Sequence, residues 1–253
     1  MLIEFVGCSG AGKTTHIERA LRVLSDRGRA AACSTALVAR ATRTAWISNL
    51  LLRNICLNVV LFPWLLLALR RHARFFFFGI RHIVCRADSA LGILQRSLSQ
   101  ARNLAANELL RRLDSAPEFI LVDEGTICGV HNVLVHLKRL PESDWIETYS
   151  RLVPKPDLVI HLDTPVGLAL TRTQNRPDPP LRFHILSDRL RFVQFGHDTH
   201  EVLSKCEAFR NSWYTVHPGD ASSPLGDQTP EDIVSLILSK EAENNGHGYC
   251  RES

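Results

Sequence analysis

The sequence predicts an α/β fold of three layers, in which helices cover both faces of a parallel sheet of five strands. Two patterns support this fold class. Short, continuous apolar runs, typical of strands buried on both faces, recur along the chain. Segments with helical periodicity separate them, and this alternation favours a parallel sheet with ligands at the carboxyl ends of its strands. The expected strands are residues 2–6, 30–36, 119–122, 158–162 and 213–216.

The helices expected between these strands follow from apolar spacing and from start signals. Residues 13–27 follow the first strand closely, and residues 89–113 place an apolar side chain about every 3.6 positions. We expect further helices at 141–152, 165–173, 187–209 and 229–241. The chain is therefore predicted to form one domain over residues 1–241, with a helical region at 37–112 and a disordered tail at 242–253.

Composition limits the class of protein. With 253 residues, of which 45% are hydrophobic, the chain can bury one core of ordinary size. Its seven cysteines are scattered and none form a CxxC pair, which argues against a disulfide framework and a zinc site. The chain opens directly on a strand, without a basic leader or apolar signal core. We therefore expect a cytoplasmic location.

The strongest motif follows the first strand, where residues 7–14 read GCSGAGKT and fit GxxxxGK[ST], the P-loop. Glycines let the backbone curl so that consecutive N–H groups point at phosphate oxygens. The helix that begins here adds the positive end of its dipole. Lys13 is expected to reach the β- and γ-phosphates of ATP, and Thr14 to bind Mg²⁺. The expected nucleotide-binding residues are Gly7, Cys8, Ser9, Gly10, Ala11, Gly12, Lys13, Thr14 and Thr15.

A second signal is the apolar run at 119–122, which ends at two carboxylates, Asp123 and Glu124. Acids at a strand end suggest a metal and a phosphate nearby, and Asp123 is expected to bind Mg²⁺ together with Thr14. The pair does not decide between hydrolysis of ATP and phosphoryl transfer to an acceptor, because many P-loop ATPases also hold metal in this way.

The P-loop, the "VDEG" strand end and the stretch PKPDLVIHLDTPVGLALTRTQNR at 154–176 together resemble the nucleoside monophosphate kinases, particularly thymidylate kinases. In that family a strand ending in Leu-Asp is followed by proline, a helix and arginines on a mobile lid, which matches residues 172–186 here. The resemblance implies ATP and Mg²⁺ as cofactors. It also implies that Arg172 and Arg176, with Arg182 as a third arginine, approach the transferring phosphate. The loop beside the adenine would contain Asp220 and Ala221.

The arginine pair favours a kinase over an ATPase. Arg172 and Arg176 are four residues apart, so they share one face of a helix end, and such arginines stabilise charge in phosphoryl transfer. A lid also keeps water out, which suits transfer to an acceptor. Ordinary ion pairing at a helix end is the alternative explanation, and a nucleotide-operated switch or ATPase acting on a membrane or protein is the competing function. The candidate catalytic residues are Lys13, Asp123, Glu124, Arg172 and Arg176.

Glu124 departs from the pattern of the family. Thymidylate kinases have an arginine after the strand-end acid, which grips the acceptor's phosphate, whereas a carboxylate there repels a phosphate. The resemblance makes a nucleoside monophosphate the default acceptor, and Glu124 favours another small molecule with a free hydroxyl. Glu124 itself can serve as a general base, as a ligand to metal-bound water or as the partner of an arginine.

The helical region at 37–112 is strongly basic, with twelve arginines against Asp88 and Glu108, and contains an apolar run at 55–69. The run is too short to span a membrane and includes a proline. We expect it to form helices that roof an acceptor cavity with one apolar wall, and peripheral membrane contact is the less favoured alternative. The expected partner is a small-molecule acceptor, apolar or anionic. Nucleic acid is not an expected partner, because aromatic residues do not alternate regularly with the basic ones. The sequence leaves open whether the chain forms a homodimer.

Overall fold

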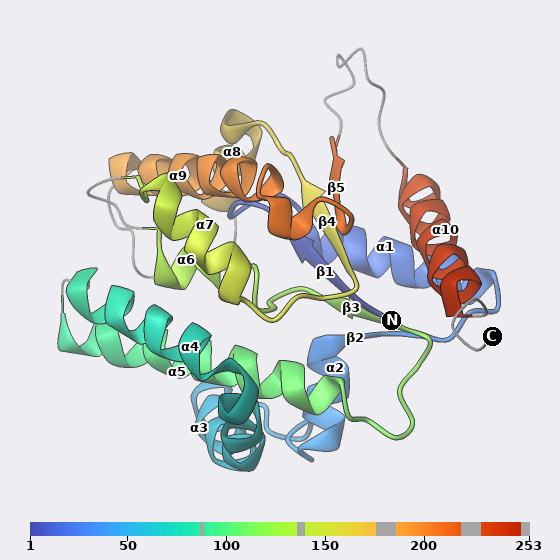
Figure 1. Cartoon of the computed structure of the whole chain (residues 1–253), viewed down its shortest axis with the longest axis horizontal. Helices are drawn as coiled ribbons and strands as arrows, with labels where there is room; N and C mark the ends of the chain where they lie inside the picture. The colour runs from blue at the N-terminus through green and yellow to red at the C-terminus, as the bar shows by residue number, and fades with distance from the viewer. Residues whose placement is uncertain (87–88, 136–139, 176–185, 219–228, 249–253) are drawn as a thin grey trace.

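We describe a computed structural model of the chain, covering residues 1–86, 89–135, 140–175, 186–218 and 229–248. Strands and helices alternate along most of the chain, as Figure 1 shows. The strands are β1 (Leu2–Val6), β2 (Ala31–Cys33), β3 (Phe119–Val122), β4 (Leu158–Leu162) and β5 (Trp213–Val216). The helices are α1 (Lys13–Asp26), α2 (Ser34–Ala41), α3 (Leu50–Val60), α4 (Phe62–Arg86), α5 (Ala90–Leu110), α6 (Val130–Val133), α7 (Ser143–Leu152), α8 (Val166–Gln174), α9 (Leu186–Ser204) and α10 (Pro230–Gly248).

The five strands form one parallel sheet in the order β2-β3-β1-β4-β5. The predicted parallel sheet of five strands is therefore confirmed. β1 is central and pairs with β3 on one side and β4 on the other, so that Ile3 lies opposite both Leu121 and Leu158. This order brings the loops after β1, β3 and β4 to the same edge of the sheet. The P-loop and the acidic end of β3 consequently lie side by side.

Both faces of the sheet are covered by helices. Ile3 and Phe5 of β1 point to a core built with α1 and α10. Val6 of β1 points to the opposite core, built with α4, α6 and α7, and Leu2 packs with α2 and α5. Continuous apolar strands are expected wherever both faces of a sheet are buried, which explains the runs in the sequence.

Three elements differ from the sequence-based expectation. β2 ends at Cys33, and residues 34–36 begin α2 instead of continuing the strand. The helix expected at 187–209 ends at Ser204, and a short 3-10 turn, Glu207–Phe209, follows. α10 extends to Gly248, so residues 242–248 are helical rather than part of a disordered tail, and residues 249–253 lie outside the described residues.

The basic region at 37–112 is helical throughout most of its length, as expected. α4 and α5 lie side by side in the lower left of Figure 1, and α3 lies below them at the bottom of the picture. α4 bends at His72, where φ is −122° and ψ is 24°. Two of these helices, α3 and α5, border a cavity at the end of β3, where the two acids follow the strand.

Candidate functional site

The P-loop depends on glycine at two positions with positive φ. Gly12 precedes α1 with φ of +90°, and Gly10 has φ of +84°. A Cβ on Gly10 would lie 2.1 Å from the carbonyl oxygen of Ala169 in α8, closer than any side chain tolerates. The loop therefore passes against α8 with no room for a side chain, and its N–H groups converge at the N-terminus of α1.

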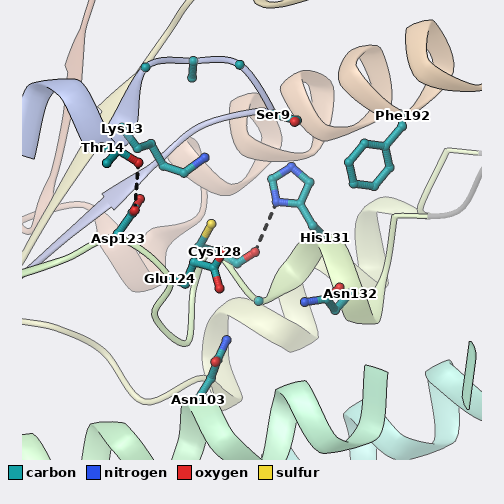
Figure 2. A pocket seen from close by; sticks show the side chains of 14 residues that line it. Ser9, Lys13, Thr14, Asn103, Asp123, Glu124, Cys128, His131, Asn132 and Phe192 are labelled. Atoms are coloured by element: carbon teal, nitrogen blue, oxygen red, sulfur yellow. Dashed lines mark hydrogen bonds between the residues drawn. The ribbon is translucent and has the colours of Figure 1, made fainter. Parts of the chain in front are cut away.

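Lys13 and Thr14, the first residues of α1, point into the space enclosed by the loop (Figure 2). The Lys13 ammonium donates hydrogen bonds to the carbonyls of Gly7, at 3.0 Å, and Cys8, at 3.3 Å. The Thr14 hydroxyl donates to Oδ2 of Asp123, at 3.0 Å, across the gap between α1 and the end of β3. The structure thus brings together the two residues that the sequence predicts as metal ligands.

These residues fit a nucleotide with Mg²⁺. The Thr14 hydroxyl and the Asp123 carboxylate are hard oxygen donors beside a ring of phosphate-binding amides, and Mg²⁺ commonly takes one or two protein oxygens while phosphates and water complete its shell. Within the described ranges no cluster of three His, Cys, Asp or Glu side chains is arranged to hold a metal ion without a phosphate. The donor set therefore suits Mg²⁺ delivered with a triphosphate.

A cavity of about 270 Å³, which we call the phosphate pocket, lies over the loop. Its floor is the P-loop, and its walls come from the end of β3, from α6 and from α9. Figure 2 shows Lys13, Asp123 and His131 directed toward it. The pocket is lined mainly by polar groups, as a site for phosphates requires.

A larger cavity of about 730 Å³, which we call the helical cavity, adjoins the phosphate pocket. It lies between the end of β3 and helices α2, α3 and α5, and Asn103, Asp123 and Glu124 line both spaces. Its lining combines apolar side chains with arginine and asparagine side chains, and α3 and α5 each supply both kinds. The apolar residues are Val38, Leu57, Ala106, Leu110 and Val122, and the polar ones include Arg53, Asn54, Arg102 and Asn107.

The cavity has the expected apolar side chains, but they are not confined to one wall, and α3 contributes to them while α4 does not. Its chemistry is more mixed than expected because two arginines face the same space. Arg102 donates a hydrogen bond to the amide oxygen of Asn54, at 3.3 Å. Arg53 forms no ion pair with any residue that the structure describes, so its charge is available to a ligand.

Glu124 is exposed at the junction of the two cavities. Its carboxylate forms no hydrogen bond or ion pair within the described part of the chain, so the role of arginine partner receives no support there. Asn103, from α5, donates to the carbonyl of the neighbouring Gly125, at 3.2 Å, and fixes the backbone beside it. The carboxylate is therefore held at the junction but left open to a ligand.

Arg172 lies in the last turn of α8 and reaches the P-loop. Its Nη1 lies 3.4 Å from the position that a Cβ on Gly12 would occupy. The guanidinium group therefore lies beside the backbone of the loop at Gly12. Most of the expected lid lies outside the described residues, including Arg176 and Arg182. The expected adenine loop, with Asp220 and Ala221, also lies outside them.

No family model matches the sequence. No curated protein matches it either. Among solved structures, the chain is similar to shikimate kinase from Acinetobacter baumannii in complex with shikimate, with 20% identity, a TM-score of 0.40, and coverage of 96% of this chain and 93% of that one. It is also similar to deoxyadenosine kinase from M. mycoides with bound dATP, with 14% identity, a TM-score of 0.47, and coverage of 96% and 100%. Because the identities and TM-scores are this low, we infer the function from the chain's own residues.

Glu4 is a site residue that the sequence reasoning missed. It sits inside β1 with 1% exposure, and its Oε1 accepts a hydrogen bond from the N–H of Cys128, at 2.7 Å. Burial raises the pKa of Glu4 to about 7, and the N–H groups of residues 126–128 partly offset this. Gly125 permits the approach, because a Cβ there would lie 2.4 Å from the Glu4 carboxyl. The sequence does contain a signal for this role, because Glu4 is the one charged residue in the otherwise apolar strand LIEFV.

Three buried histidines were also missed as a group. His131 lines the phosphate pocket, and its ring lies 4.7 Å from that of His200, which lies 5.7 Å from that of His161. Burial lowers the pKa of His131 and His161 to about 4, and it also lowers the pKa of His200 well below its usual value. All three are therefore neutral near pH 7, and no spacing along the sequence could show that they meet.

Cys8 behaves as the sequence suggests, as a backbone contributor. Its thiol is buried, and burial raises the pKa of that thiol to about 11. The thiolate is therefore scarce at neutral pH, and the contact that Cys8 makes in the site is its carbonyl oxygen to Lys13.

Proposed function

We propose that the protein is an ATP- and Mg²⁺-dependent kinase that phosphorylates a small molecule. The observation that carries this proposal is the adjacency of the two cavities, which share Asp123 and Glu124. Hydrolysis needs only a water molecule beside the triphosphate. A transferase needs a second, larger space that opens onto the transferring phosphate, and the helical cavity supplies it.

The chain's residues divide the work of phosphoryl transfer. The loop amides and the start of α1 bind phosphate oxygens, and Lys13 exchanges the carbonyls of Gly7 and Cys8 for the β- and γ-phosphates. Thr14 and Asp123 would hold Mg²⁺, which supplies positive charge that neutralises the phosphates. Arg172 approaches the same phosphates from α8 and stabilises the charge on the outermost one.

Glu124 acts as the general base in this proposal. An acceptor hydroxyl in the helical cavity would donate its proton to the Glu124 carboxylate as the hydroxyl oxygen forms its bond to the γ-phosphorus. The bond from that phosphorus to the oxygen bridging the β- and γ-phosphates would break, and ADP would leave. A carboxylate suffices, because the transition state of phosphoryl transfer is loose and needs little activation of the nucleophile. Its open position at the junction of the cavities supports this role over a structural one.

The helical cavity favours an acceptor with an apolar body, a hydroxyl toward Glu124 and a polar or anionic group toward the arginines. A nucleoside monophosphate is the second candidate, and Arg53 is the observation that favours it, since it can hold a phosphate within the same cavity. In that case the phosphate that accepts the transfer must approach Glu124, and the two negative charges repel.

The test is a survey of acceptor classes in which release of ADP is measured with and without each compound. Nucleosides, sugars, isoprenoid alcohols and nucleoside monophosphates cover the alternatives. We expect slow hydrolysis alone and strong stimulation by a compound with a hydroxyl. Glu124→Gln, which keeps shape and removes the base, should lower kcat by about 10²- to 10⁴-fold without changing ATP binding. An equal rate of hydrolysis with every compound would instead indicate a nucleotide-operated switch.

A further inference from the structure

Most of the exposed large apolar side chains lie on α3 and α4, and three more, Leu91, Leu94 and Leu98, lie on α5. Along α3, Leu52, Ile55 and Val59 recur at spacings of three and four residues, so they form one stripe, and Val59 is 68% exposed. Solvent-exposed apolar side chains are common singly, but a stripe of them along a helix indicates a surface that is covered in use.

On α4 the exposed stripe alternates apolar and basic residues. It consists of Leu66, Arg70, Arg74, Phe77, Arg81 and Val84, which succeed one another at spacings of three or four. Phe77 is 65% exposed. We call the α3 and α4 stripes together the outer stripe. Long arginine side chains can lay their apolar stems along such a surface while their charged ends stay in a polar layer.

Acidic groups are scarce around the outer stripe. The region at 37–112 has only two carboxylates. Glu108 is 3% exposed and forms an ion pair with Arg112, and Asp88 lies outside the described residues. The described surface of α3 and α4 is therefore apolar and positive, which complements a partner that is apolar and negative.

The inner side of α4 is already occupied by the protein. Ala68, Phe75 and Ile83 are buried in the core that contains Tyr149. No described helix is by itself long and apolar enough to cross a bilayer, and α3 and α4 satisfy the criterion only jointly, as a pair bent by 56°. Because α4 is packed against the body of the protein along its inner side, its outer side is the part that can meet lipid.

A second copy of the chain is a poor partner for this surface. A symmetric dimer places the same patch of both subunits face to face, so the arginines of α4 would meet their own counterparts. Like charges brought together at an interface cost free energy, and α3 and α4 themselves carry no carboxylate that would offset them. Charge complementarity thus selects an anionic surface.

We propose that the outer stripe docks on a membrane surface that contains anionic lipids. Ile55, Val59 and Phe77 enter the boundary between headgroups and acyl chains, and Arg70, Arg74 and Arg81 contact lipid phosphates. This docking does not depend on the reaction catalysed, since neither stripe is part of the phosphate pocket.

The test is sedimentation of the full chain with vesicles of phosphatidylcholine, with and without phosphatidylglycerol. We expect binding to the anionic vesicles that weakens as salt is added. The variant Arg70→Gln/Arg74→Gln/Arg81→Gln should reduce the partition coefficient by about 100-fold, because each arginine contributes about fivefold. The variant Ile55→Ser/Val59→Ser/Phe77→Ser should lose the binding that persists at high salt.

A matched control removes the same charge elsewhere. Arg19→Gln/Arg22→Gln/Arg27→Gln alters three exposed arginines of α1 and its C-cap, on the helix that covers the other face of the sheet. Binding should persist in this control, and thermal unfolding followed by circular dichroism verifies that each variant folds.

Three results would overturn the proposal. They are equal binding to uncharged vesicles, an equal loss in the α1 control, and a dimer in lipid-free light scattering that the serine variant converts to monomer. The last of these would assign the outer stripe to a second copy of the chain.

Discussion

Glu4 Oε1 accepts a hydrogen bond from the backbone N–H of Cys128, at 2.7 Å, from inside the central strand of the sheet. The bond ties β1 to the loop that follows Glu124. A buried carboxyl thus holds the segment that carries the proposed general base. Its pKa of about 7, raised by burial from 4.5, makes the strength of this connection depend on pH near neutrality.

The first prediction concerns this carboxyl. Because its pKa is higher in the folded state, the contribution of Glu4 to the free energy of unfolding is full below pH 4.5 and declines as pH rises to about 7. Glu4→Gln cannot ionise. The stability of this variant relative to the natural chain should therefore increase between pH 4.5 and pH 7.5, by about 3 kcal/mol. Urea unfolding across this range measures it, and parallel curves for the two proteins would contradict it.

The second prediction concerns the buried histidines and has the opposite sign. A pKa lowered by burial means that the stabilising neutral form persists above pH 6.5 and that stability is lost as pH falls toward 4. His161→Gln, which has similar size and no charge, should reduce that loss by up to about 3 kcal/mol. Urea unfolding at pH 7 and pH 4.5 gives the comparison. A loss of the same size in both proteins would rule out His161 as a cause.

The third prediction uses two glycines with opposite surroundings. Gly10→Ala should lower stability by at least about 1–3 kcal/mol and impair ATP binding, because φ is +84° and the new Cβ would meet Ala169. Gly167, in α8, has no atom within 4 Å of its added Cβ, so Gly167→Ala should stabilise by about 0.5–1 kcal/mol. Thermal unfolding of both variants tests this, and similar effects would contradict the packing of loop against α8.

The fourth prediction tests the hydroxyl group of Thr14 separately from the shape of its side chain. Thr14→Val removes the hydrogen bond to Asp123 and the expected metal ligand, so affinity for ATP measured with Mg²⁺ should fall by at least about tenfold. Thr14→Ser retains the oxygen and should bind normally. Calorimetric titration with ATP, with and without Mg²⁺, measures both. If valine and serine behave alike, Thr14 is not a metal ligand.

The sheet could be predicted because its strands are buried on both faces and each reads as a continuous apolar run. β1, β3, β4 and β5 occur at the expected residues, whereas β2 is shorter, because the chain turns into α2 directly after Cys33. The P-loop, and its proximity to Asp123, followed from the parallel order of the strands. Local pattern was sufficient for these features.

The rest of the site depends on contacts between residues far apart in the sequence. The histidine ring contacts join α6, α9 and β4 and leave no local signal. The role of Glu4 becomes visible only when Gly125 packs against it, 121 positions later in the chain. The sequence predicted that the helices at 37–112 cover an acceptor cavity. It could not predict which side of each helix stays exposed, because that depends on tertiary packing.

The wall shared by the phosphate pocket and the helical cavity has a pharmacological consequence. Since Asp123 and Glu124 border both spaces, one compound that joins a triphosphate mimic to an acceptor-like group can occupy them together. Such a bisubstrate ligand gains from the high effective concentration of its second half once the first is bound. The linker length that gives the tightest inhibitor would then report the separation between donor and acceptor.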